Sequence, residues 1–237
     1  VYDGRAAKVM LNQDKVRQIE EYYAQCELEG ANEHQVEESQ KAVAKMEVII
    51  GDPDRLRAVA EDFIKHYETR VAEGATVAGK AMFVCSNRNI AYDFYKIVKE
   101  LRPKWTEKKI CDDGVVLSEK DKKELKPMEK IKLVMTRNKD DEKDLFDMLG
   151  TKEDRKEFDR QFKNPKSNFK IAIVVDMWLT GFDVPELDTI YIDKPIQQHT
   201  LIQTISRVNR VCEGKDKGLI VDYIGTVSYT HLRAHET

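Results

Sequence analysis

Three long polar side chains near the C-terminal end have a spacing that could serve phosphate chemistry. Gln203, Arg207 and Arg210 stand at positions i, i+4 and i+7 of a stretch with helical periodicity, so they project from one face of the predicted helix. Arginine keeps its charge and presents a planar fork of donors that fits phosphate oxygens. Two such forks one helical turn apart suit a polyphosphate whose charge shifts during cleavage. The alternative is a solvated helix face with two unrelated arginines.

The residues before this helix predict the sheet that positions it. Residues 171–175 form an apolar, β-branched run, which is typical of a strand buried on both faces of a parallel sheet. Asp176 follows, and a turn with the sequence Thr180-Gly181-Phe182-Asp183-Val184-Pro185 leads to a second predicted strand at 189–192. The pattern therefore predicts that the arginine helix packs beside a buried sheet.

These segments resemble a known family of motors. Gln203-x-x-Ser206-Arg207-x-x-Arg210 resembles motif VI of superfamily 2 helicases and translocases, and the turn at 180–185 resembles their motif V. The sequences of residues 176–195 and 199–210 most resemble the motor (R) subunit of type I restriction endonucleases. The opening Tyr2-Asp3-Gly4-Arg5 resembles the Tyr-Glu-Gly-Arg segment with which that family begins its second motor domain.

The resemblance implies roles for particular residues. Arg210 would be the arginine finger on the γ-phosphate, with Arg207 beside it and Gln203 orienting water or coupling the site to motif V. Gly181 and Asp183 would bind ATP, Asp183 through the ribose. The residues implied to contact the DNA backbone are Val175, Asp176, Met177 and Thr180, with Ser86, Asn87 and Arg88 of a segment that resembles motif IV. For Ser86 and Asn87, ordinary helix capping is the alternative.

The resemblance also implies cofactors and partners. ATP and Mg²⁺ would be bound between two motor domains, with the magnesium ligands supplied by the first of them. The partners would be double-stranded DNA, the first motor and nuclease domains of the same subunit, and the methyltransferase and specificity subunits. No metal ligand is expected from the chain itself.

The alternation of elements predicts an α/β fold. Strands are expected at 80–85, 132–136, 169–175, 189–192 and 219–224, with helices mostly between them. This order indicates a RecA-like parallel sheet flanked by helices. Residues 1–73 are expected to form an N-terminal helical extension, with helices at 14–25, 34–50 and 53–73, and residues 74–226 the second motor domain with a polar insertion near 102–129. Residues 227–237 resemble translated sequencing-adapter sequence and are expected to be a non-native tail.

Composition argues against non-specific DNA binding by the whole chain, against a disulfide or zinc framework, and against a membrane span. Of the 237 residues, 35% are charged, yet the net charge is only −3, so any contact with DNA must be local. The four cysteines are widely spaced without a Cys-x-x-Cys pair, which favours a reducing cytoplasm over a disulfide framework or zinc site. No apolar run is long enough to span a membrane.

The chain carries only part of the chemistry that the resemblance implies. It has no G-x-x-x-x-G-K-[ST] loop and no nuclease constellation. The resemblance implies that it is part of an ATP-dependent type I site-specific deoxyribonuclease, a hydrolase. Because the loop and the nuclease centre are missing, we expect the chain to be inactive alone. The alternatives are the second motor domain of another superfamily 2 DNA or RNA helicase, and a non-enzymatic module whose arginine face binds a partner.

Overall fold

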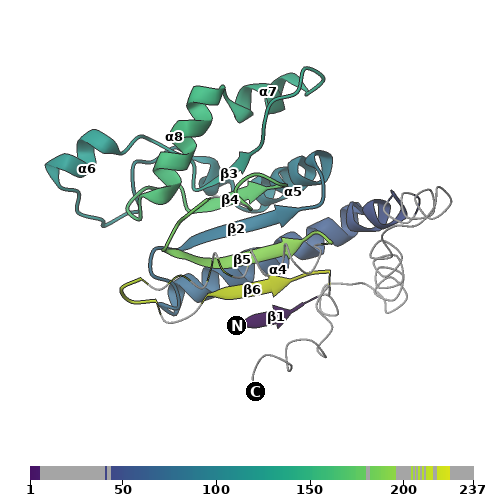
Figure 1. The fold of residues 1–237 in the computed structure, drawn as a ribbon, viewed down its shortest axis with the longest axis horizontal. Helices are drawn as coiled ribbons and strands as arrows, with labels where there is room; N and C mark the ends of the chain where they lie inside the picture. Colours follow the sequence, from purple (N-terminus) through teal and green to yellow (C-terminus); the bar gives the residue numbers. More distant parts are fainter. Residues whose placement is uncertain are drawn as a thin grey trace.

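A parallel β-sheet forms the centre of the molecule. The computed structural model describes residues 1–5, 41, 44–179, 182–195, 204, 206, 208, 210, 212–215 and 218–224. Within these residues the sheet has six strands in the order β1-β6-β5-β2-β4-β3, and every pair is parallel (Figure 1). The strands are β1 (Tyr2–Gly4), β2 (Lys80–Cys85), β3 (Ile131–Val134), β4 (Ile171–Val174), β5 (Leu187–Asp193) and β6 (Leu219–Asp222). The expected α/β class is confirmed.

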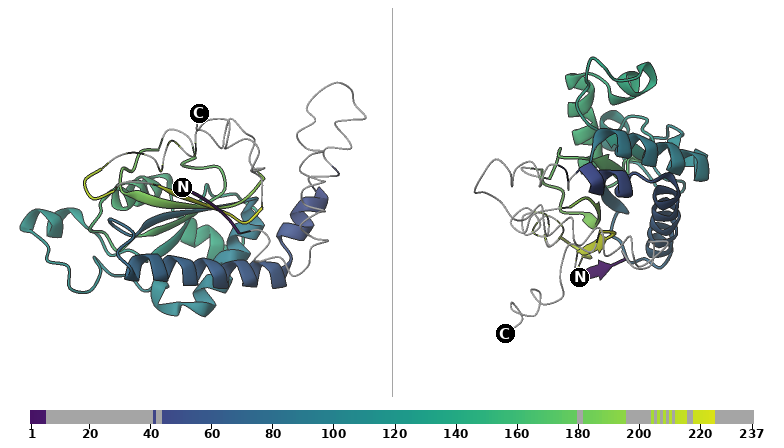
Figure 2. Two further views of the ribbon diagram at one scale, coloured as in Figure 1. Left: turned by 90° about the horizontal axis from the view of Figure 1, so that it is seen from below. Right: turned by 90° about the vertical axis from the view of Figure 1, so that its right-hand side faces the viewer.

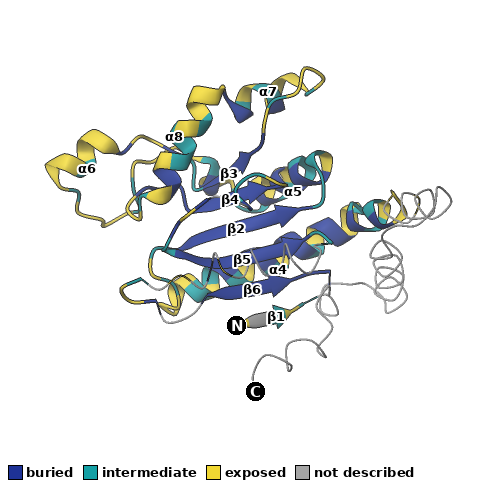
Figure 3. Cartoon of the chain, viewed as in Figure 1, coloured by how far each residue is buried: buried dark blue, intermediate teal, exposed yellow. Residues whose placement is uncertain are grey.

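Side chains of the central strands alternate between two cores. In β2, Ala81, Phe83 and Cys85 enter one apolar cluster, whereas Met82 and Val84 enter the other. Strands buried on both faces read as continuous apolar runs, and this explains the sequence pattern of β2 and β4. Figure 3 shows strands β2 to β6 as a continuously buried layer.

Two helices cover the first face of the sheet. Helix α4 (Pro53–Ala72) begins at Asp52, whose side chain accepts a hydrogen bond from the Arg55 amide, with proline in the first turn. Helix α5 (Arg88–Leu101) packs next to it, and Figure 2 shows α4 running across this face. Phe83 of β2 stacks on Phe94 of α5 with 4.0 Å between ring centroids.

The second face is covered by helix α8 and by irregular chain. Helix α8 (Lys152–Lys163) buries Phe162, which lies 5.0 Å from the ring of Phe169. The same cluster contains Leu179 and Phe182 from the segment between β4 and β5, together with Val208. The segment with the motif V resemblance is therefore part of the core of this face.

The N-terminal residues contribute directly to the sheet. Strand β1 pairs with β6, and Arg5 bonds to Asp62 of α4 at 2.9 Å. Helix α4 spans nearly the expected 53–73 and supplies Val59, Phe63 and Tyr67 to the core. Residues 1–73 were expected to form a helical extension, whereas in the structure β1 is a strand of the sheet and α4 packs on its first face. Residues 44–50 are helical; the expected helix at 14–25 lies outside the described residues, as does most of 34–43.

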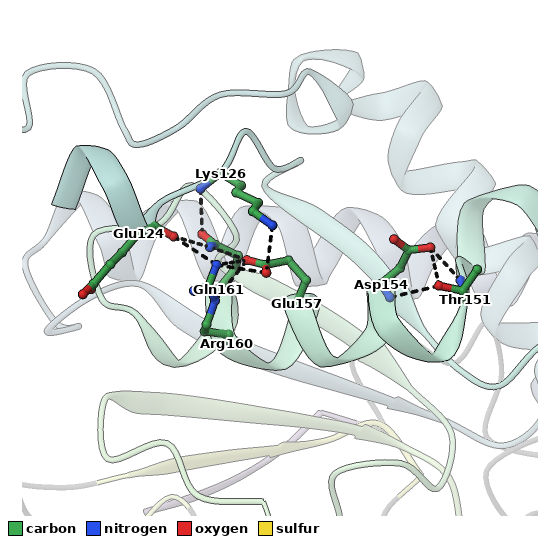
Figure 4. A network of polar contacts seen from close by, with 7 residues as sticks. All are labelled: Glu124, Lys126, Thr151, Asp154, Glu157, Arg160 and Gln161. Carbon is green, nitrogen blue, oxygen red and sulfur yellow. Dashed lines mark hydrogen bonds and ion pairs between the residues drawn. The ribbon is translucent and has the colours of Figure 1, made fainter. Parts of the chain in front are cut away.

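The polar stretch at 102–129 is held against α8. It forms a short 3-10 helix η1 (Pro103–Thr106) and helix α6 (Glu119–Glu124), and Lys109 bridges to Met128. Figure 4 shows the polar contacts that attach its end to α8: the Gln161 amide donates to the Glu124 carbonyl at 2.9 Å and accepts from the Lys126 amide at 3.2 Å. Glu157 accepts a charged hydrogen bond from Lys126 at 3.1 Å. Helix α7 (Lys143–Leu149) precedes α8.

The described residues contain neither a membrane-spanning helix nor a metal-binding cluster. No helix among them is long and apolar enough to cross a membrane. Within the same part of the chain, no group of His, Cys, Asp and Glu side chains is arranged to hold a metal ion.

Candidate functional site

An ion pair joins the two segments that carry the motif resemblances. Arg210 donates from its guanidinium group to Asp183 Oδ2 at 2.6 Å. Both side chains are about half exposed, at 49% and 46%, so solvent reaches the pair. The pair thus lies on the surface, where another anion can reach the arginine.

Burial on one side of the helical segment orients Arg210 outward. Thr204 and Val208 are each 1% exposed and face the core, whereas Ser206 and Arg210 are exposed. Thr204 and Val208 are separated by one helical turn and share a face. Gln203 and Arg207 lie outside the described residues, so the predicted group of three polar side chains stays a prediction beyond Arg210.

The position of Asp183 places this pair near the amino end of β5. The Leu187 amide, at the start of β5, donates to the Val184 carbonyl at 3.0 Å. Lys215 holds the same stretch by donating to the carbonyls of Pro185 and Leu187, each at 2.8 Å, and burial lowers the pKa of this lysine. Arg210 is therefore separated from the carboxyl ends of the strands. Gly181, the other predicted ATP-binding residue, lies outside the described residues.

The predicted DNA-binding residues that the structure describes gather at the carboxyl ends of β2 and β4, which are adjacent strands. Asp176 is 81% exposed and pairs with Lys194 Nζ, which also donates to the Val175 carbonyl at 3.3 Å. Met177 is partly buried against the second core. Thr180 lies outside the described residues.

The turn after β2 makes contacts within the chain. Ser86 Oγ donates to the Asp193 carbonyl at 3.0 Å, and the Asn87 side chain caps α5 by accepting from the Ile90 amide at 2.9 Å. The capping alternative therefore holds for Asn87.

Arg88 connects this turn to the loop after β3. Its Nη2 group donates to both carboxylate oxygens of Asp141, at 2.6 and 2.7 Å, and its Nη1 group donates to the Thr136 carbonyl at 2.6 Å. Most of its donors are thus already bound.

A buried ion pair at the carboxyl end of β5 was not predicted from the sequence. Arg55 of α4 and Asp193 at the end of β5 are 1% and 0% exposed and make two hydrogen bonds to each other. Arg55 also donates to the Ile50 carbonyl at 3.0 Å and the Tyr223 carbonyl at 3.4 Å. The pair therefore ties α4, β5 and the end of β6 together. The residues are 138 positions apart, so no local pattern could pair them.

The site thus belongs to an α/β protein in which an exposed arginine lies beside a loop packed into the core. Comparison with known proteins shows the family to which the chain belongs. Residues 77–225 match the family model described as type I restriction enzyme subunit R domain 3. The chain therefore belongs to the type I restriction enzyme R subunit family.

Relatives of known name agree with the family match. The chain is 37% identical over 192 residues to the type I restriction enzyme HindI endonuclease subunit of Haemophilus influenzae, covering 80% of this chain and 16% of the relative. It is 40% identical over 197 residues to the putative type I restriction enzyme MjaIXP endonuclease subunit of Methanocaldococcus jannaschii, covering 82% and 16%. The chain thus spans about one sixth of the length of these relatives.

Solved structures give a weaker likeness. Bacteriophage T4 UvsW aligns with a TM-score of 0.43 and 14% identity, over 85% of this chain and 30% of that chain. The helicase domain of Hef from Pyrococcus furiosus aligns with a TM-score of 0.40 and 15% identity, over 94% and 38%. These scores carry no functional argument.

Proposed function

We propose that this chain is the second motor domain of an ATP-dependent DNA translocase within the R subunit of a type I restriction-modification endonuclease of the cytoplasm. The observation that carries the proposal is the exposed Arg210–Asp183 pair between the two segments with motif resemblances. Family membership and the named relatives support the same reading.

The energetics of the pair suit an arginine that changes partners. An exposed ion pair contributes about 0–1 kcal/mol, so moving Arg210 from Asp183 to another anion costs little. A phosphate group offers more negative charge and several acceptor oxygens, which makes it the stronger partner for a guanidinium group. Arg210 would thus stabilise negative charge that develops on the γ-phosphate, with Arg207 and Gln203 beside it.

The expected cofactors fit this division of labour. The exposed Arg210 suits an anionic nucleotide, whereas the described residues contain no acidic cluster that would hold Mg²⁺. As the resemblance implies, the magnesium ligands would come from the first motor domain. Bound between the two motor domains, ATP would supply the phosphoryl group whose cleavage drives the motor, while this chain would supply Arg210, Gly181 and Asp183.

DNA would be contacted at the carboxyl ends of β2 and β4. The side chains of Ser86, Asn87 and Arg88 are engaged within the chain, so contacts from this turn would use mainly backbone amides. Lys194 brings a positive charge to the same edge, near Val175, Asp176 and Met177. Contacts to phosphate read no sequence, so site recognition would come from the specificity subunit, in a complex that also holds the methyltransferase subunit.

The proposal is tested by ATP hydrolysis in the complete subunit that contains this chain. Arg210→Ala should lower DNA-stimulated turnover by about 10²–10³-fold, the usual effect of removing one donor to a transition-state charge. Arg160→Ala is the matched control, because Arg160 is also an exposed arginine paired with a carboxylate, Glu157 at 2.8 Å. Equal turnover in the two variants would remove the arginine-finger assignment.

A further inference from the structure

The loop between β4 and β5 connects the two candidate regions. It leaves the carboxyl end of β4 at Asp176, which pairs with Lys194, and reaches Asp183, which pairs with Arg210 near the amino end of β5. The loop thus runs from the proposed DNA edge to the proposed nucleotide side. Any change at one end reaches the other only if the loop moves as a unit.

An aromatic stack braces this loop internally. The rings of Trp178 and Phe182 lie 4.1 Å apart at an angle of 2°, so they are stacked almost parallel. Trp178 and Phe182 are four positions apart, and residues 180 and 181 between them lie outside the described residues. The stack is therefore a direct contact between the two described parts of the loop.

Trp178 is held in an unfavourable backbone conformation. Its φ of 68° makes it the one non-glycine residue with a positive φ among the described residues. A bulky residue with positive φ is a true outlier and persists where surrounding contacts determine it. The contacts of the indole ring are thus what keeps the turn after Asp176 in this shape.

The brace also touches the elements on either side. Phe162 of α8 lies 5.3 Å from Trp178 and 6.0 Å from Phe182, so the stack is packed against a rigid helix. Thr204, from the helical segment that leads to Arg210, lines the same small space as Trp178 and Phe182. The stack therefore lies beside the segment that leads to Arg210.

We infer that Trp178 is a positioning residue whose stack on Phe182 couples residues 176–179, at the proposed DNA edge, to residues 182–183, which include Asp183 of the Arg210–Asp183 pair. This inference rests on the proposed function and adds the residue that links its two regions. Trp178 would act through this stack, by holding Asp176 and Asp183 in fixed relative positions.

The first test compares ATP hydrolysis with and without duplex DNA in the complete subunit. Trp178→Ala should lower the ratio of the two rates at least tenfold, while the rate without DNA stays within about twofold. Trp178→Phe keeps an aromatic face for Phe182 and should retain most of the ratio. An unchanged ratio in Trp178→Ala, or an equal loss in both rates, would overturn the inference.

A second test does not depend on turnover. Hydrogen exchange of peptides that cover 182–187 is measured in the complete subunit with duplex DNA added and no nucleotide. The natural protein should show DNA-induced protection there, although these residues lie at the far end of the loop, and Trp178→Leu should lose it. Protection that is absent in the natural protein, or retained in Trp178→Leu, would overturn the inference.

The proposed function and the connector role of Trp178 would be contradicted by different results. If the natural subunit shows no DNA-stimulated hydrolysis, the proposed function fails. If it shows stimulation that Trp178→Ala leaves intact, only the connector role fails.

Discussion

The buried Arg55–Asp193 pair gives the sharpest prediction about stability. Removing one member of a buried pair leaves an uncompensated charge and costs about 3–5 kcal/mol. Arg55→Met would leave the Asp193 carboxylate at 0% exposure without its partner, and the carbonyls of Ile50 and Tyr223 would lose a donor. We therefore expect a loss at the upper end of this range.

The assay is urea unfolding of the chain followed by circular dichroism. With an m-value of about 2 kcal/mol/M, a loss of about 5 kcal/mol lowers the midpoint by roughly 2.5 M. Arg57→Met is the matched control: Arg57 is on the same helix but pairs with Glu100 at 46% and 66% exposure, and its loss should cost at most about 1 kcal/mol. The double change Arg55→Met with Asp193→Leu should recover most of the stability, because an apolar pair replaces the ionic one. Equal midpoints for Arg55→Met and Arg57→Met would refute this reasoning.

Two further predictions concern pH and backbone packing. Burial, followed by the charges of nearby arginines, lowers the pKa of His66 to about 4. Between pH 6.5 and 4 the unfolded chain therefore binds a proton that the folded chain does not, so stability falls as pH falls through this window, by about 1–2 kcal/mol after allowance for solvent screening. The unfolding free energy of His66→Gln should fall less over the same window, and parallel pH curves for the two proteins would contradict this assignment. Gly218→Ala would place a Cβ 2.2 Å from the Val208 carbonyl oxygen, and should cost about 1–3 kcal/mol or more in a thermal melt; Gly74→Ala, with nothing within 4 Å but a φ of +68°, should cost only about 1–2 kcal/mol, and the reverse order would contradict the packing at Gly218.

Local patterns predicted most of the fold. Strand β2 begins and ends as expected, because its six residues are all buried and read as an apolar run. The start of α4 follows from Asp52 and Pro53, and the cap of α5 from Asn87. In each case the signal lies within a few neighbouring residues.

The parts that were missed depend on contacts between distant residues. Strand β1 has only three residues, too few for a periodic pattern, and it exists through its pairing with β6. Helix α4 was assigned to an appendage because its amphipathic pattern does not say which surface it covers. The pairing of Arg55 with Asp193 and the positive φ of Trp178 likewise arise from tertiary packing.

In the candidate site, too, the sequence indicated residues but not the contacts that their side chains make. The sequence singled out Arg210 for a phosphate and Asp183 for a ribose; the structure shows the two side chains bonded to each other, and both roles stay predictions. A motif fixes which residue types recur, whereas the partners of each side chain depend on the fold.

If ATP hydrolysis that depends on Arg210 drives movement along duplex DNA, the moving enzyme should displace a third strand bound to that DNA. The complete enzyme is loaded at its recognition site on linear duplexes that carry a triplex at increasing distances, and release of the third strand is followed after ATP is added. The account predicts a lag that grows in proportion to distance for the natural enzyme and for Arg160→Ala, and no release for Arg210→Ala. Release without a distance-dependent lag, or release that Arg210→Ala leaves unchanged, would contradict it.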